Sequence, residues 1–207
     1  MLNTTLVIVV INVWEESDMR PLLCVLGASG SGKTTLCVEL EKRYGLKSIP
    51  SYTTRQPRFE GEQGHTFITE DEFDKLKDIL AYAKTDNCRY AVTKEMLENE
   101  EYSIYVVDTS GLLYLYDHYR GDRPLISVFI DSDVYDRFNR MVSREDDRTY
   151  EEKVKAALER IEHDSIEFNI GLIHRHVNYV FKNFEGHFND TVNMVGRICE
   201  NYGIIKE

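Results

Sequence analysis

Short runs of apolar residues alternate along this chain with longer segments in which apolar residues recur every three or four positions. The apolar runs predict buried strands, and the periodic segments predict amphipathic helices. The predicted strands lie in residues 21–29, 46–49, 104–108, 125–131 and 177–181, and the predicted helices in residues 33–45, 70–80, 111–119, 133–144, 150–168 and 188–202. This alternation predicts an α/β fold with a mostly parallel sheet and helices on both faces. Such sheets bind ligands beyond the carboxyl ends of their strands.

The N-terminal segment, residues 1–20, carries the apolar run "TLVIVVINVW". That run is too short to cross a bilayer, for which about 20 residues are needed. It has neither a basic start nor a small-residue cleavage site, so it does not read as a signal peptide. We expect an extra edge strand here. The alternative is a translated upstream extension that ends before Met19.

The length, net charge and cysteine content of the chain limit the kinds of partner that it is expected to bind. The 207 residues suffice for one well-cored domain, residues 21–207. The formal net charge of -11 argues against nucleic acid and membrane surfaces as partners, because both are polyanionic. Four cysteines lack metal-ligand spacing and predict free thiols in a reducing cytoplasmic compartment. The oligomeric state stays open.

A glycine-rich segment follows the first predicted strand of this domain. "GASGSGKT" matches the phosphate-loop pattern G-x-x-x-x-G-K-[ST] at every fixed position. Backbone N–H groups of such a loop, and the start of the next helix, surround phosphate oxygens. Lys33 is expected to reach the outer phosphates, and the Thr34 hydroxyl to hold Mg²⁺. The predicted phosphate-binding residues are Gly27, Ala28, Ser29, Gly30, Ser31, Gly32, Lys33, Thr34 and Thr35. The motif alone does not separate a kinase from a GTPase or an ATPase.

The stretch "SYTTRQPRFEGEQGHTFITEDEF" at residues 51–73 narrows the choice among kinase, GTPase and ATPase. Together with the phosphate loop it resembles guanylate kinases, over a span from about Leu22 to Asn183. The resemblance implies a three-layer α/β/α P-loop kinase fold with a central parallel sheet, an inserted NMP-binding subdomain and a short lid. The implied boundaries are a core of residues 21–47, 93–136 and 150–207, an NMP-binding segment of residues 48–92, and a lid of about residues 137–149.

The resemblance implies that residues 51–58 hold the phosphate of an acceptor monophosphate. Arg55 and Arg58 suit that task, because guanidinium groups make forked, charge-assisted hydrogen bonds to phosphate. Ser51 matches the family's serine, although the spacing allows either Ser51 or Tyr52 to point inward. Tyr90 matches a tyrosine that contacts the same phosphate. A further family tyrosine is replaced here, by His65 or by Phe67 depending on the end from which the segment is counted.

The positions at which the family reads guanine differ in this chain. Ala81 stands where the family has a glutamate, and Val92 where it has a serine or threonine. Loss of such hydrogen-bonding groups removes discrimination between bases. Asp108 matches the family's remaining base-reading aspartate, and it could equally hold a Mg²⁺-bound water at the end of its strand.

Four arginines, Arg137, Arg140, Arg144 and Arg148, fall within an arc of about 80° on the helix predicted from residue 133. The resemblance aligns Arg140 and Arg144 with lid arginines that stabilise the moving phosphoryl group. For Arg137 and Arg148, a solvated charged face explains the pattern as well as function does.

Two further residues complete the implied site. Ala157 occupies the place of the family's third arginine, and Arg160 lies nearly one turn away. We expect Arg160 to contact phosphate. Asn183 takes the place of an asparagine near the adenine of ATP, although an asparagine in the turn after a strand is the plain alternative.

The sequence therefore predicts a nucleoside monophosphate kinase that uses ATP and Mg²⁺, with GMP or dGMP as the first expected acceptor. Ala81 and Val92 keep open a related P-loop kinase that acts on another nucleotide, a deoxynucleotide or a sugar phosphate. A non-catalytic guanylate-kinase-like interaction module is a third hypothesis. The intact Lys33 and Thr34 argue against it.

Overall fold

A computed structural model describes residues 8–9, 17–57, 60–62, 64–85, 87–144, 147–168, 173 and 175–205. Within these ranges the strands are β1 (Ile8–Val9), β2 (Leu22–Leu26), β3 (Ser51–Thr53), β4 (His65–Phe67), β5 (Ile79–Thr85), β6 (Cys88–Thr93), β7 (Ile104–Val106), β8 (Leu125–Asp131) and β9 (Tyr179–Lys182). The helices are α1 (Lys33–Tyr44), α2 (Glu70–Phe73), α3 (Lys94–Glu98), α4 (Thr109–His118), α5 (Val134–Val142), α6 (Tyr150–Glu167) and α8 (Phe188–Asn201).

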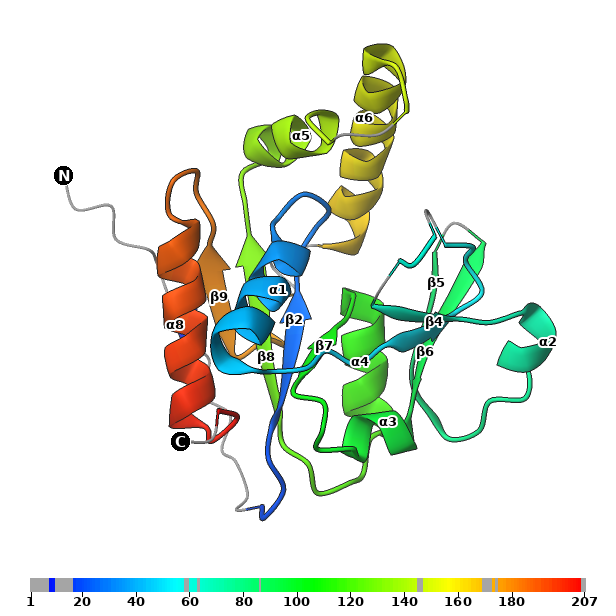
Figure 1. Ribbon diagram of the computed structural model, residues 1–207, viewed down its shortest axis with the longest axis vertical. Coiled ribbons are helices and arrows are strands. Elements are labelled where there is room, and N and C mark those ends of the chain that lie inside the picture. The colour runs from blue at the N-terminus through cyan, green and yellow to red at the C-terminus, as the bar shows by residue number, and fades with distance from the viewer. Residues whose placement is uncertain are drawn as a thin grey trace.

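The central sheet has the strand order β1-β9-β8-β2-β7 (Figure 1). β2, β7, β8 and β9 run parallel, whereas β1 pairs antiparallel with β9. β2 lies between β8 and β7, and every residue from Leu22 to Leu26 is buried, as expected for an interior strand covered on both faces. This arrangement confirms the predicted α/β fold with a parallel sheet between helices.

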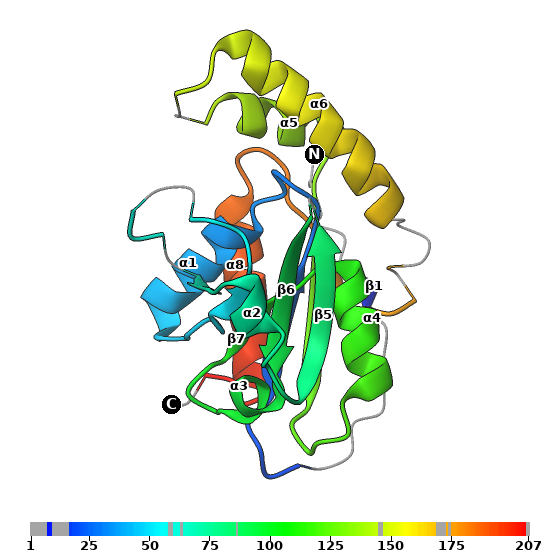
Figure 2. The same ribbon diagram turned by 90° about the vertical axis from the view of Figure 1, so that its right-hand side faces the viewer.

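Alternate residues of β2 face two different cores, because successive side chains of a strand point to opposite faces. Leu23 and Val25 belong to the core that α1 and α8 cover. Cys24 and Leu26 belong to the core that α4 covers, where Leu112 contributes from the helix. The views in Figures 1 and 2 agree that α1 and α8 lie on one side of the sheet and α4 on the other.

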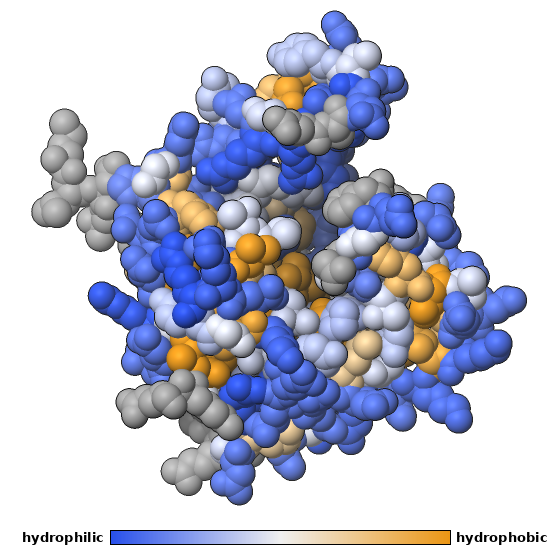
Figure 3. All heavy atoms as spheres, viewed as in Figure 1, coloured by the Kyte–Doolittle hydropathy of each residue, from blue (hydrophilic) through white to orange (hydrophobic). Residues whose placement is uncertain are grey.

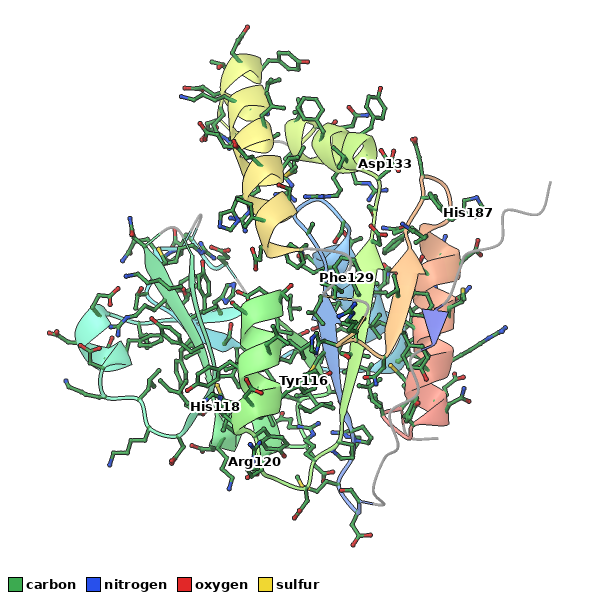
Figure 4. The ribbon with its side chains drawn as sticks, turned by 180° about the vertical axis from the view of Figure 1, so that it is seen from behind. Tyr116, His118, Arg120, Phe129, Asp133 and His187 are labelled. Carbon is green, nitrogen blue, oxygen red and sulfur yellow. The ribbon has the colours of Figure 1, made fainter. Side chains whose placement is uncertain are left out.

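Strands β3 to β6 form a second, smaller sheet beside the first, with strand order β4-β3-β6-β5 (Figure 2). The α5–α6 pair forms a third part, above the carboxyl end of β8 (Figure 1). Asp133, labelled in Figure 4, starts α5 by accepting a 2.8 Å hydrogen bond from the Tyr135 N–H. The phosphate loop therefore faces both smaller parts of the molecule.

Two predicted elements were wrong. Residues 46–49 do not form a strand of the sheet and make only an isolated bridge from Ser48 to Ile104. The helix predicted over residues 70–80 ends after Phe73, although a Thr69–Glu72 capping box begins it as a helix. Asp78 takes a left-handed backbone conformation with φ 51°, which turns the chain into β5.

In the described ranges, no helix combines the length and the apolar character needed to cross a membrane.

Candidate active site

The phosphate loop links the end of β2 to the first turn of α1. Gly30 has φ 77°, and a Cβ there would lie 2.7 Å from the Arg137 carbonyl oxygen. Gly32 has φ 99°, and a Cβ there would lie 2.7 Å from the Asn183 amide nitrogen. Only glycine satisfies both the left-handed backbone and the close approach at these positions. The loop is therefore held between α1, α5 and the segment after β9.

Lys33 is the first residue of α1, and its ammonium folds back over the loop. Nζ donates to the Gly27 carbonyl and, over 3.1 Å, to the Ala28 carbonyl. Burial lowers the pKa of Lys33 to about 8, and the nearby negative charge of Asp164 opposes this shift. The ammonium is therefore held by carbonyls of the loop itself, at the place where a bound polyphosphate could accept its hydrogen bonds.

The loop fits an anionic ligand. The first turn of α1 contains no acidic residue, so the positive end of the helix dipole is not neutralised. Ser31 Oγ is buried and has no hydrogen-bond partner among the described residues. Thr34 and Thr35 follow on α1 and are exposed. These features match a nucleotide phosphate chain, and the Thr34 hydroxyl is a suitable oxygen ligand for Mg²⁺.

A cavity of about 890 Å³ joins the phosphate loop to the small sheet and to the α5–α6 pair. The space-filling view shows the hollow between these parts (Figure 3). Six of its lining residues are cationic: Lys33, Arg55, Arg144, Arg148, Lys153 and Arg160. Three are acidic: Asp108, Asp147 and Glu167. A chain of net charge -11 therefore gathers cations around one cavity, which favours a polyanionic ligand there.

On the side of the small sheet, Arg55 is held at the cavity by a forked ion pair. Its Nη1 and Nη2 donate to the two carboxylate oxygens of Glu62 over 3.1 and 2.8 Å. Its guanidinium also lies 5.3 Å from the centre of the Phe67 ring. Glu62 therefore fixes the direction of Arg55. Arg58 lies outside the described residues.

The hydroxyl and aromatic residues of the acceptor segment lie together. Ser51 is buried, and its Oγ is 3.0 Å from His65 Nδ1. The His65 ring lies 5.8 Å from that of Tyr90, which lines the cavity. Of the two residues considered for the family tyrosine, His65 thus shares the polar cluster of Ser51 and Tyr90, whereas Phe67 supports Arg55.

Ala81 and Val92 lie opposite each other on β5 and β6. Their exposed fractions are 1% and 0%, and both belong to the core beneath α4. Neither is among the residues lining the cavity. Asp108 does line the cavity, and its Oδ1 also caps α4 by accepting from the Gly111 N–H over 2.6 Å. The small sheet is therefore apolar at both positions where this sequence differs from the guanine-reading residues of guanylate kinases.

The arginines predicted to contact the transferring phosphate, Arg140, Arg144 and Arg160, fall into two groups. Arg144 and Arg160 line the cavity, and Arg160 Nε donates to Ser29 Oγ over 2.7 Å. Arg140 instead donates to the Gly30 carbonyl over 3.1 Å and is absent from the residues that line the cavity. Its guanidinium therefore braces the phosphate loop rather than facing the open space.

Asn183 also contacts the loop from behind. Its side-chain amide donates to the Ser31 carbonyl over 2.8 Å, and the residue is almost fully buried. The amide group is thus engaged with the phosphate loop at the place where the resemblance implied an adenine contact. Asn183 and Arg140 thus bind the carbonyls of two neighbouring loop residues, Ser31 and Gly30.

The sequence left Arg137 undecided between function and a solvated face, and it assigned no role to Asp164. Arg137 donates from Nε to the Ser29 carbonyl over 2.8 Å, and Asp164 accepts from the Ser29 N–H over 2.6 Å. Asp164 follows the buried Ala157 by seven residues, which puts both on one face of α6. That spacing was the available signal, because an acidic residue on the inward face of a helix needs a buried partner.

Glu167, the last residue of α6, lines the cavity and lies close enough to Asp108 for their charges to interact. Burial raises the pKa of Glu167, and the negative charge of Asp108 raises it further. Both side chains line the same space as Lys33.

The parallel sheet with its phosphate loop, the second small sheet and the overlying helical pair are consistent with a P-loop α/β kinase fold. Comparison with protein-family models gives no match. The chain is 29% identical over 199 residues to a guanylate kinase of Clostridium tetani, covering 90% of this chain and 93% of the relative. It is 26% identical over 157 residues to a guanylate kinase of Fusobacterium nucleatum, covering 72% of this chain and 85% of the relative.

A solved guanylate kinase structure from Anaplasma phagocytophilum shares the fold, with a TM-score of 0.56 and 20% sequence identity over 89% of this chain and 87% of that one. These relatives and this structural neighbour support the guanylate kinase family for this chain. Guanylate kinases are nucleoside monophosphate kinases, and the similarity supports an enzyme of that class.

Proposed function

We propose that this enzyme transfers the γ-phosphoryl group of ATP to a nucleoside monophosphate, with GMP or dGMP as the first expected acceptor. The single observation that carries the proposal is one cavity that contains Lys33 of the phosphate loop, Arg55 and Tyr90 of the acceptor segment, and Arg160 of α6. Two phosphate-binding groups on opposite sides of one space are what transfer between two phosphates requires.

In the proposed reaction, the phosphate loop binds the donor and Arg55 binds the acceptor phosphate, with Tyr90 beside it. Mg²⁺, held by Thr34 with Asp108 as a further candidate ligand, would supply charge neutralisation on the donor phosphates. Lys33, Arg144 and Arg160 stabilise charge that spreads over the moving phosphoryl group.

No strong general base is required, because a monophosphate dianion is already a competent nucleophile. The α5–α6 pair covers the loop and limits access of water, which would otherwise compete as acceptor and make the enzyme an ATPase.

A coupled assay of ADP release tests the proposed function. The wild-type enzyme is assayed with ATP and Mg²⁺ alone, and then with GMP, dGMP, the other NMPs and dNMPs, and ribose phosphates. We expect ADP release to rise strongly only when a nucleoside monophosphate is present. Release that no acceptor increases would contradict transfer and indicate hydrolysis.

The burial of Ala81 and Val92 favours a second candidate, a kinase with a different acceptor. A family member with hydrogen-bonding groups at these positions can discriminate between bases by about 10⁴-fold or more. Here we expect kcat/KM for GMP to exceed that for the best non-guanine acceptor by less than about 10²-fold. The same acceptor panel measures this ratio, and strong turnover with GMP alone would eliminate the second candidate.

Replacing Arg55 with alanine is expected to raise the KM for the acceptor by about 10- to 100-fold, since it removes charge-assisted hydrogen bonds to phosphate. The KM for ATP should change by less than about threefold, because this side chain belongs to the acceptor side of the cavity. Steady-state kinetics with each substrate varied in turn measure both constants.

The matched control is Arg89→Ala. Arg89 lies on the same small sheet and pairs with Asp74 over 2.7 Å, outside the cavity lining. This variant should leave both KM values within about threefold of wild type. Equal effects of Arg55→Ala on the two KM values would contradict the assignment.

A further inference from the structure

Asp164 of α6 is a buried carboxylate at the phosphate loop. Its side chain has an exposed fraction of 0%. Oδ2 accepts from the Ser29 N–H over 2.6 Å and from Arg137 Nη2 over 2.7 Å. Oδ1 lies 3.5 Å from Arg160 Nε. One carboxylate therefore contacts a backbone group of the loop and two arginines from two helices.

Arg137 completes a clamp on the same loop residue. Its Nε donates to the Ser29 carbonyl over 2.8 Å, while Asp164 takes the Ser29 N–H. Both backbone groups of Ser29 are thus bound by side chains of the α5–α6 pair. The Arg137 backbone also approaches Gly30 so closely that a Cβ at Gly30 would lie 2.7 Å from its carbonyl oxygen. This close approach requires that the glycine at position 30 lie directly opposite the Arg137 backbone.

Arg160 takes its direction from this clamp. Its Nε donates to Ser29 Oγ over 2.7 Å and faces Asp164, while the residue lines the cavity. A change at Asp164 would therefore alter both the position of Ser29 and the partner that orients Arg160.

Stability alone does not explain a buried charged pair. Taking two charges out of water costs several kcal/mol per ion, and well-packed apolar residues of similar volume are often as stabilising. The C-terminal end of α6 is also packed against the sheet by a contact that does not involve Asp164. The ring of Phe168, the C-cap residue, stacks on Phe129 with centroids 6.0 Å apart. Figure 4 labels Phe129 on β8, beneath this end of the helix.

We propose that Asp164 is a positioning residue: with Arg137, it clamps Ser29 of the phosphate loop to the α5–α6 pair and so orients Arg160 toward the transferring phosphoryl group. This inference rests on the proposed function. It adds to the active site a carboxylate that contacts no substrate and acts through Ser29 and Arg160.

The first test compares Asp164→Asn, Asp164→Glu and the wild type. Asp164→Asn should lower kcat by about 10²-fold and leave both KM values within about threefold, because misplacing a transition-state group costs rate rather than ground-state binding. Asp164→Glu restores the charge and should recover part of kcat. The control Glu159→Gln makes the same chemical change on α6 at an exposed ion pair with Lys155, and should match the wild type.

Hydrogen exchange adds a readout independent of activity. In Asp164→Asn, exchange in the loop segment 27–32 should be faster by about tenfold or more. Exchange in β8 should stay unchanged, which excludes global destabilisation as the cause. Unchanged exchange in the loop would overturn the clamp, whether or not the enzyme turns over any acceptor.

The double variant Arg137→Met/Asp164→Leu separates positioning from stability. It replaces the buried pair with apolar side chains, so its unfolding temperature should lie near that of the wild type. Its kcat should remain as low as that of Asp164→Asn. Recovery of kcat together with stability would overturn the inference. An inactive wild type would instead reject the proposed function, and unaffected variants of an active wild type would reject only the role of Asp164.

Discussion

Replacing Lys33 with methionine is expected to lower kcat by about 10²- to 10³-fold while the protein stays folded. The ammonium lies over the phosphate loop, where Nζ donates to the Gly27 and Ala28 carbonyls. No other lysine lies within the loop itself, so its charge has no local substitute. Methionine keeps the length of the side chain and removes only the charge and the donors.

The measurement for Lys33→Met is steady-state ADP release with saturating acceptor, together with thermal unfolding. The fold should survive, because the lost hydrogen bonds are worth only about 1 kcal/mol each. The control is Lys155→Met on α6, whose exposed side chain pairs with Glu159, and it should retain wild-type kcat. A Lys33→Met enzyme that retains more than a third of wild-type kcat would contradict the role of this residue.

Replacing Arg160 with methionine is expected to lower kcat by about 10³-fold, the lower end of what an arginine placed on a transferring phosphoryl group contributes. Ser29 Oγ and Asp164 hold this guanidinium at the cavity, between the phosphate loop and the acceptor side. Because the charge on the phosphoryl group spreads only in the transition state, the loss should appear in kcat and much less in either KM.

Single-turnover kinetics with enzyme in excess measure the chemical step of Arg160→Met directly. The matched control is Arg197→Met, at an exposed position of α8 on the far side of the central sheet, and it should leave the rate unchanged. A large rise in the KM for either substrate with an unchanged chemical rate would assign Arg160 to ground-state binding instead.

The local part of the site was predictable from sequence, because its residues are contiguous. The phosphate loop encloses its ligand with its own backbone, so the order of glycines and Lys33 specifies strand, loop and helix together. The parallel sheet was predictable for a similar reason, since apolar periodicity reports which faces of each element are buried. The prediction of a helix over residues 70–80 was wrong, because the turn at Asp78 overrides a helical pattern that begins with a good N-terminal cap.

The four arginines predicted on the helix from residue 133 illustrate the opposite case. On one continuous helix their spacing would put all four within one arc, but the spacing does not tell where the helix ends. Helix α5 ends at Val142, so Arg137 and Arg140 lie on it and bind loop carbonyls, whereas Arg144 and Arg148 lie beyond it and line the cavity.

The sequence by itself determined the phosphate-binding loop between a strand and a helix, and it showed apolar residues, Ala81 and Val92, at the two positions that resemble guanine-reading ones in guanylate kinases. Only the tertiary structure decided that Ala81 and Val92 are sealed beneath α4 and that Asp164 reaches Ser29, 135 residues away along the chain. Contacts of this kind depend on how remote elements pack, and each residue's own neighbours in sequence carry little information about that packing.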